Sequence, residues 1–345
     1  MTRRAHWIGR LWLAGSVVLA AGCVTQKVAR MIATAPNQQH VPAIVRNQAY
    51  RESYDALYAE AWRVPVGPPS AEISVATLEP GDYHFHYEIV FKDLGNGHSS
   101  FAPKHDWQAP NPRLPRAKTV KGTIVVIPGY QETKEDVVHW GLRLAESGYR
   151  AVLVDLRGQG RSTGNWMGYG SFEPHDLRQV LDDLQARGLA GEKIGVLGIS
   201  YGASMSLLWA VQDPRVGAVV ALEPFSSARE ATRDLGRALM PKLSAMLSDA
   251  QLARAQDEAA RLGGFAWQDG DVLAAVERLK APVLYLHGEK DTWLSPENSR
   301  RLYARTAGPK DILTGKYDTH VLLAVRLDPI DKVALAWFAR WLPPE

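Results

Sequence analysis

The chain has 345 residues, of which 46% are hydrophobic and 22% charged, and its formal net charge is +3. This is an ordinary globular composition, with enough apolar residues for one large or two moderate domains. Lysine and arginine are dispersed along the chain, which excludes the concentrated basic surface expected of a nucleic-acid-binding protein.

The first segment has the features of a secretory signal. Arg3, Arg4 and Arg10 precede a short apolar run at 11–21, and small residues stand directly before Cys23. A basic start, a short apolar stretch and small residues before a cleavage point are typical of export signals, and the run is too short to span a bilayer comfortably. Cys23 is the only cysteine of the chain, so it cannot form an internal disulfide.

The sequence Leu-Ala-Ala-Gly-Cys that ends at Cys23 resembles the bacterial lipoprotein signal, in which the cysteine is diacylated and becomes the first residue. This resemblance implies a signal peptide at 1–22 and a lipid anchor to a membrane through Cys23. Val24 in the second position resembles outer-membrane sorting signals, which implies an exported protein on the periplasmic side of that membrane. The alternative is an uncleaved anchor with an incidental cysteine.

Residues 23–70 are expected to form an N-terminal segment and linker. Aromatic and apolar residues recur at helical spacing within 47–62 and predict one amphipathic helix. The Pro- and Gly-rich run at 64–69 is expected to break that helix and to form the linker.

An antiparallel hairpin is predicted next. Residues 73–78 and 83–91 alternate apolar and polar side chains on either side of a Pro-Gly turn at 79–82. His84 and His86 share the polar face of the second strand, a spacing that suits a metal, but a solvent-facing strand explains the same alternation. No metal site is therefore predicted. The stretch 92–118 is expected to be a long loop.

From residue 122 onward, short apolar segments alternate with amphipathic ones. The amphipathic segments 135–147, 173–187 and 297–306 predict helices. Strands that alternate with helices indicate an α/β protein with a mostly parallel, doubly wound sheet that is covered on both faces. The predicted strands are 123–127, 151–154, 194–197, 216–222, 282–286 and 311–313.

One connection is far longer than the others. About fifty residues of helix-forming sequence separate two of the predicted strands, which exceeds the usual length of a connection. We therefore expect residues 225–279 to form a helical cap or lid over the carboxyl edge of the sheet. The core domain is expected at 71–224 and 280–345.

A candidate nucleophile follows the predicted strand at 194–197. The pentapeptide Gly198-Ile199-Ser200-Tyr201-Gly202 stands between that strand and a helix-forming segment. Its glycines place no Cβ near the turn, so Ser200 can adopt a strained conformation with its hydroxyl above the sheet edge. The N–H groups at the start of the helix can stabilise a negative oxygen. We expect the N–H of Tyr201 to be one oxyanion donor.

A serine hydroxyl needs a base to become nucleophilic, and the base needs an orienting carboxylate. In an open α/β sheet these groups lie at the carboxyl ends of other strands. Asp291 and His320 each follow a predicted strand on this edge, and the order Ser, Asp, His is the one expected after such an elbow. Glu223 follows another strand and is the alternative acid.

Residues from about 120 to 342 resemble the α/β-hydrolase-fold serine hydrolases. This resemblance implies that the backbone N–H of Tyr130 is the second oxyanion donor, although Pro128 replaces the histidine usual in that loop. It also implies that Arg157 and Arg161 brace the second loop. The motifs that carry the resemblance are Ile127-Pro128-Gly129-Tyr130, the Asp155–Ser162 segment, the elbow at 198–202, His287-Gly288-Glu289-Lys290-Asp291 and His320.

We therefore expect an esterase- or lipase-like serine hydrolase that cleaves small-molecule carboxylic esters or related acyl bonds through an acyl-enzyme, without metal or organic cofactor. A peptidase or amidase of the same fold and a non-catalytic envelope binding protein remain alternatives. The sequence does not predict the acyl chain, ester against amide, or the oligomeric state. Trp166, Phe225, Trp267 and Trp293 are candidates for an acyl pocket or for simple packing.

Overall fold

The computed structural model describes residues 24–95, 98–108 and 119–342, so the predicted signal peptide and Cys23 lie outside the described residues. Within the described part of the chain, no helix combines the length and the apolar character needed to cross a membrane.

A central sheet of eight strands organises the molecule, in the order β1-β2-β6-β5-β7-β8-β9-β10. The strands from β5 to β10 pair in parallel, whereas β2 runs antiparallel to both β1 and β6. The predicted mostly parallel sheet is thus confirmed. The strands are β1 (Glu60–Val66), β2 (Ala71–Leu78), β5 (Thr123–Ile127), β6 (Arg150–Val154), β7 (Ile194–Ile199), β8 (Val216–Leu222), β9 (Val283–Gly288) and β10 (Lys310–Gly315).

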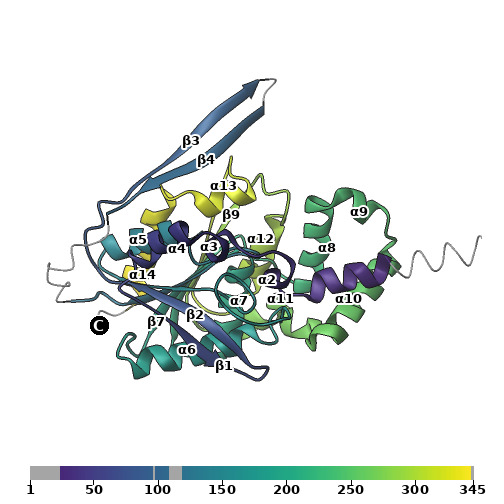
Figure 1. Cartoon of the computed structure of the whole chain (residues 1–345), viewed down its shortest axis with the longest axis horizontal. Coiled ribbons are helices and arrows are strands. Elements are labelled where there is room, and N and C mark those ends of the chain that lie inside the picture. The colour runs from purple at the N-terminus through teal and green to yellow at the C-terminus, as the bar shows by residue number, and fades with distance from the viewer. Residues whose placement is uncertain (1–23, 96–97, 109–118, 343–345) are drawn as a thin grey trace, which may run out of the picture.

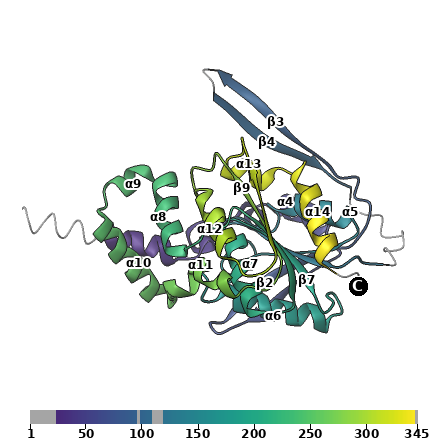
Figure 2. The ribbon, with the colours of Figure 1, turned by 180° about the vertical axis from the view of Figure 1, so that it is seen from behind.

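Both faces of the sheet are buried, because alternate residues of the central strands enter different hydrophobic clusters. Val125 and Ile127 pack in the cluster that includes α6 and α7, while Ile124 and Val126 pack in the one that includes α5 and α14. The strands therefore read as continuous apolar runs. The covering helices, visible in Figures 1 and 2, are α5 (Val138–Glu146), α6 (Glu173–Ala186), α7 (Tyr201–Gln212), α12 (Glu297–Arg305), α13 (His320–Val325) and α14 (Ile330–Trp341).

The pairing predicted for the hairpin at 73–91 is wrong. β2 pairs with β1 and β6 inside the main sheet, where both of its edges are occupied. The segment after it forms β3 (His86–Gly95), which pairs instead with β4 (His98–Asp106) in a ribbon that projects from the body (Figure 1). The expected linker at 64–69 and the expected loop at 92–118 therefore both contribute strand residues.

The N-terminal segment contains more than the one predicted helix. Residues 24–33 are helical, and two short helices, α2 (Pro36–Gln39) and α3 (Ala43–Arg46), follow. The predicted helix at 47–62 is shorter than expected: α4 covers Gln48–Asp55, with Asn47 accepting the N–H of Tyr50 as its cap. The chain then enters β1.

The long insertion between β8 and β9 is helical, as its sequence predicts. Ser248 and Gln251 cap the start of one of its helices reciprocally, and Gly264 ends it in the left-handed region. The inserted helices lie at one end of the sheet (Figure 1). They are α8 (Ala228–Leu239), α9 (Pro241–Ala245), α10 (Asp249–Gly263) and α11 (Val272–Ala275).

A buried charge cluster fixes the loop that follows β6. Asp155 accepts hydrogen bonds from the backbone N–H of Lys134 at 2.7 Å, the Lys134 ammonium at 2.8 Å and the N–H of Arg161 at 2.8 Å. Arg157 makes a two-pronged ion pair with the buried Asp176 of α6. The predicted bracing of this loop by arginine is thus seen in the structure.

Removing one member of a buried ion pair leaves the other charge uncompensated. We expect Asp155→Ala to lower the free energy of unfolding by about 3–5 kcal/mol, measured by urea denaturation. Glu258→Gln, which breaks the exposed pair with Arg261, is the control and should leave the urea midpoint unchanged. Equal midpoints for the two variants would contradict this role of Asp155.

Candidate active site

Ser200 lies at the sharp turn from β7 into α7. Its backbone has φ of 51° and ψ of −112°, a conformation that is strained for a residue with a side chain. The turn needs both flanking glycines, because a Cβ at Gly202 would lie 2.4 Å from the carbonyl oxygens of Ile127 and Pro128, and one at Gly198 would lie 2.5 Å from the carbonyl oxygen of Gly202. The predicted nucleophile elbow is therefore present in its geometry.

The structure brings together Ser200 at the turn after β7, Asp291 in the loop after β9, and His320, the first residue of α13. His320 Nε2 lies 3.0 Å from Ser200 Oγ, and His320 Nδ1 lies 2.6 Å from Asp291 Oδ2. All three side chains are buried. This is the connected arrangement of nucleophile, base and carboxylate that activates a serine.

Asp291 is held as a carboxylate by several donors. The backbone N–H groups of Trp293 and Leu294 each donate to Oδ1 at 2.8 Å, and His287 Nε2 lies 3.2 Å from Oδ2. Burial by itself would raise the pKa of Asp291, but its hydrogen bonds with His287 and His320 outweigh burial and hold the pKa below its usual range. Asp291 is consequently charged at neutral pH.

Glu223, the alternative acid, also faces the imidazole. Glu223 directly follows β8, and its Oε2 lies 3.4 Å from His320 Nδ1. Burial, followed by the nearby charge of Asp291, raises the pKa of Glu223 well above its usual value. Distance and charge both favour Asp291 as the partner of His320, with Glu223 as a neutral neighbour.

Glu223, Asp291 and His320 are also spaced as metal ligands can be, with one ligand atom of each within 4.8 Å of the others. However, His320 Nδ1 already bonds Asp291 at 2.6 Å. The contacts of a serine–histidine–carboxylate arrangement account for this cluster.

The two segments that carry the predicted oxyanion donors lie beside Ser200. Tyr201 is the first residue of α7, so its N–H has no helical carbonyl partner. Tyr130 follows Gly129, where an added Cβ would lie 3.5 Å from Ser200 Cβ. The loop after β5 therefore passes directly beside the serine.

Two acidic residues that brace this region are missed by the sequence analysis. Glu132 accepts the N–H of Gly129 at 2.6 Å, and burial raises its pKa to about 7. Glu173 accepts the hydroxyl of Tyr201 at 2.8 Å and the N–H groups of two glycines in the preceding loop. Both act mainly on backbone groups, so no motif marks them; only their positions beside glycine-rich loops give a signal.

A cavity of about 280 Å³ opens at Ser200. Of the four aromatic residues proposed for an acyl pocket, Phe225 lines it. Trp293 instead packs beside His320, with ring centres 5.1 Å apart. Trp267 packs against both Tyr169 and Phe265, which also contact each other. Trp166 is 37% exposed, and its backbone forms an isolated antiparallel β-bridge with Thr34.

Comparison with known proteins agrees with this architecture. The uncharacterized protein YqkD of Bacillus subtilis (strain 168) is 25% identical over 250 residues, which cover 68% of this chain and 80% of YqkD. The Pyrococcus furiosus esterase Pf2001 superposes with a TM-score of 0.56 at 17% identity, covering 84% of this chain and 95% of that one. For 2,6-dihydroxy-pseudo-oxynicotine hydrolase the TM-score is 0.58 at 16% identity, with coverage of 86% and 72%.

These structural similarities establish the fold, and a match to a family model shows the family. The profile of the S15 family, described as X-Pro dipeptidyl-peptidase, matches residues 28–266, more than half of the chain. The chain therefore belongs to the X-Pro dipeptidyl-peptidase (S15) family of hydrolases and has the α/β-hydrolase fold of serine hydrolases.

Proposed function

We propose that this protein hydrolyses carboxylic esters through an acyl-enzyme on Ser200. The observation that carries the proposal is the chain of hydrogen bonds from Ser200 through His320 to Asp291. Ser200 also lines a largely apolar cavity. A strained serine backbone costs about 1–3 kcal/mol. A non-catalytic binding protein has no use for that strain, so the elbow argues against this alternative.

In this mechanism Ser200 Oγ attacks the ester carbonyl while His320 Nε2 takes its proton. The backbone N–H groups of Tyr130 and Tyr201 stabilise the oxyanion, and Asp291 stabilises the imidazolium. His320 then returns the proton to the leaving alcohol. A water molecule, activated by the same histidine, releases the acyl group and restores Ser200.

The cavity favours an ester over an X-Pro dipeptide. A dipeptidyl substrate carries a free ammonium group, which is costly to bury unless a carboxylate pairs with it. Among the described residues that line the cavity, the charged side chain is that of Arg233, which would repel an ammonium. The family description is the observation that favours a peptidase or amidase, so both substrate classes belong in the assay.

We also propose that the predicted segment 225–279 acts as a cap over the site. Its helices α8, α9 and α10 supply one wall of the cavity at Ser200. A small-molecule substrate would then reach the serine between these helices and the body of the protein.

Replacing Ser200 or His320 with alanine should abolish labelling by a fluorophosphonate and lower kcat/KM for p-nitrophenyl butyrate by about 10⁴- to 10⁶-fold. Ser53→Ala, an exposed serine on α4, is the control and should behave as wild type.

A Ser200→Ala variant that keeps ester turnover would overturn the mechanism. Efficient Ser200-dependent cleavage of an X-Pro p-nitroanilide without ester turnover would replace the esterase by the peptidase.

Amide substitutions of the two acids near His320 should lower turnover to very different extents. Asp291→Asn should lower kcat by about 10⁴-fold, because the wrong imidazole tautomer no longer accepts the serine proton. Glu223→Gln replaces a neutral acid by a neutral amide of the same shape and should cost far less. Steady-state kinetics on p-nitrophenyl butyrate separates them, and the reverse ranking would make Glu223 the acid.

We further propose that the protein is an exported lipoprotein anchored through Cys23, on the sequence signal alone. Wild type expressed in a bacterium with two membranes should incorporate labelled palmitate and sediment with the outer membrane. Cys23→Ala should lose both properties. Wild type without labelled fatty acid would contradict the proposal.

A further inference from the structure

The helix at 24–33 forms a wall of the cavity at Ser200. Its residues Val28, Met31 and Ile32 line that cavity together with Ser200. Ala29 and Ala33, which do not line the cavity, are buried in the hydrophobic core. This N-terminal helix is therefore part of the substrate-facing surface, far in sequence from the elbow that it faces.

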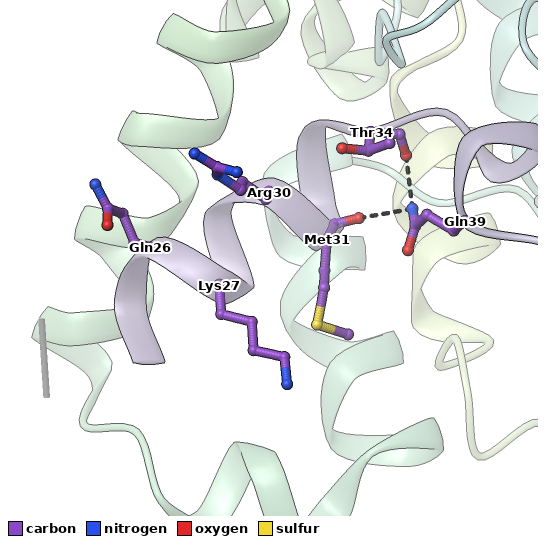
Figure 3. Close-up of a pocket in the computed structure, with 6 residues that line it drawn as sticks. All are labelled: Gln26, Lys27, Arg30, Met31, Thr34 and Gln39. Carbon is purple, nitrogen blue, oxygen red and sulfur yellow. Dashed lines mark hydrogen bonds between the residues drawn. The ribbon is translucent and has the colours of Figure 1, made fainter. Parts of the chain in front are cut away.

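Hydrogen bonds fix this helix in place. The hydroxyl of Tyr169 donates to the carbonyl of Ile32 at 2.8 Å, and the N–H of Met167 donates to the carbonyl of Ala33 at 2.9 Å. The amide of Gln39 donates to the carbonyls of Met31 at 3.1 Å and Thr34 at 2.7 Å, as Figure 3 shows. The backbone N–H of Tyr169 in turn donates to the hydroxyl of Tyr201 at 3.1 Å, which ties the wall to the elbow.

Another wall comes from the inserted helices and is mostly apolar, although Thr232, Arg233 and Ser244 also line it. Leucine side chains of these helices face the cavity, and Phe225 lines it nearer the end of β8. The apolar lining of the cavity extends to the protein surface. Leu239 and Met240 both line the cavity, and they are 49% and 41% exposed. The leucines that line it are Leu235, Leu239, Leu243, Leu247 and Leu252.

We propose that this cavity holds the extended apolar acyl chain of a lipid-like ester, and that the helix at 24–33 sets the preferred chain length. The inference rests on the proposed ester hydrolysis at Ser200. Each methylene group moved from water into an apolar site strengthens binding by up to about fourfold. An apolar space between two helical walls therefore selects for chain length, while the outward leucine and methionine accommodate a chain that exceeds the cavity.

The two sides of the helix allow a matched test. Met31 lines the cavity, whereas Arg30, the preceding residue, is exposed and points away from Met31 in Figure 3. The outer pocket drawn there is lined by Gln26, Lys27, Arg30, Met31, Thr34 and Gln39. Tryptophan at position 31 would occupy acyl space, and tryptophan at position 30 would not.

The experiment measures kcat/KM for p-nitrophenyl esters of two, four, eight and twelve carbons. In wild type kcat/KM should rise from two to eight carbons. Met31→Trp should lower the ratio for eight against two carbons by about tenfold or more, which corresponds to two or more lost methylene contacts. Arg30→Trp should keep the wild-type ratio. If Met31→Trp does not fold, Met31→Ala should shift the optimum to longer chains.

A second readout separates this inference from the proposed function. Rates of labelling by alkyl fluorophosphonates of two and ten carbons report the chain preference at Ser200 without ester turnover. Faster labelling by the longer probe, lost in Met31→Trp, together with no ester hydrolysis, would uphold the chain-length role of the helix at 24–33 and reject the ester substrate. A wild-type rate that does not rise with chain length, or equal ratios for Met31→Trp and Arg30→Trp, would overturn the inference.

Discussion

The site depends on the close approach of three backbone segments around Ser200. The carbonyls of Ile127 and Pro128 come so near Gly202 that no side chain fits there, and the serine between the two glycines is forced to a positive φ of 51°. Parallel pairing of β5 with β7 fixes this approach, because Ile127 stands opposite Gly198 in the sheet. The packing of the core therefore determines the positions of the serine hydroxyl and of the first N–H of α7.

Behind the histidine, the charge state is set by the unequal hydrogen bonding of two buried carboxyl groups. Asp291 receives backbone and side-chain hydrogen bonds that hold its pKa low, whereas burial beside Asp291 raises the pKa of Glu223. Two like charges within reach of one imidazole are costly in a buried site, so one of the two carboxyl groups is neutral. The arrangement leaves one negative charge, on Asp291, beside the imidazole of His320.

The N-terminal helix connects the cavity wall to the turn at Ser200. It lies between the core and the cavity. Its Ile32 carbonyl accepts the hydroxyl of Tyr169, and the backbone N–H of Tyr169 donates to the hydroxyl of Tyr201. Glu173 accepts a hydrogen bond from the same hydroxyl. A change in this helix can thus alter the shape of the cavity and the support of the elbow.

The sequence by itself determined the parallel sheet, the elbow and the positions of Asp291 and His320, because each depends on local patterns: apolar runs, glycine spacing and strand ends. It also indicated both carboxyl groups that face the imidazole. It favoured Asp291 over Glu223 as the partner of His320, and the distances and burial in the tertiary structure separate the two. The tertiary structure likewise decided that β2 pairs within the main sheet and that the helix at 24–33 walls the cavity. Strand pairing and cavity walls depend on contacts between segments far apart in the chain. An alternating or helical pattern of apolar residues predicts which face of a strand or helix is buried, but not which distant segment packs against that face.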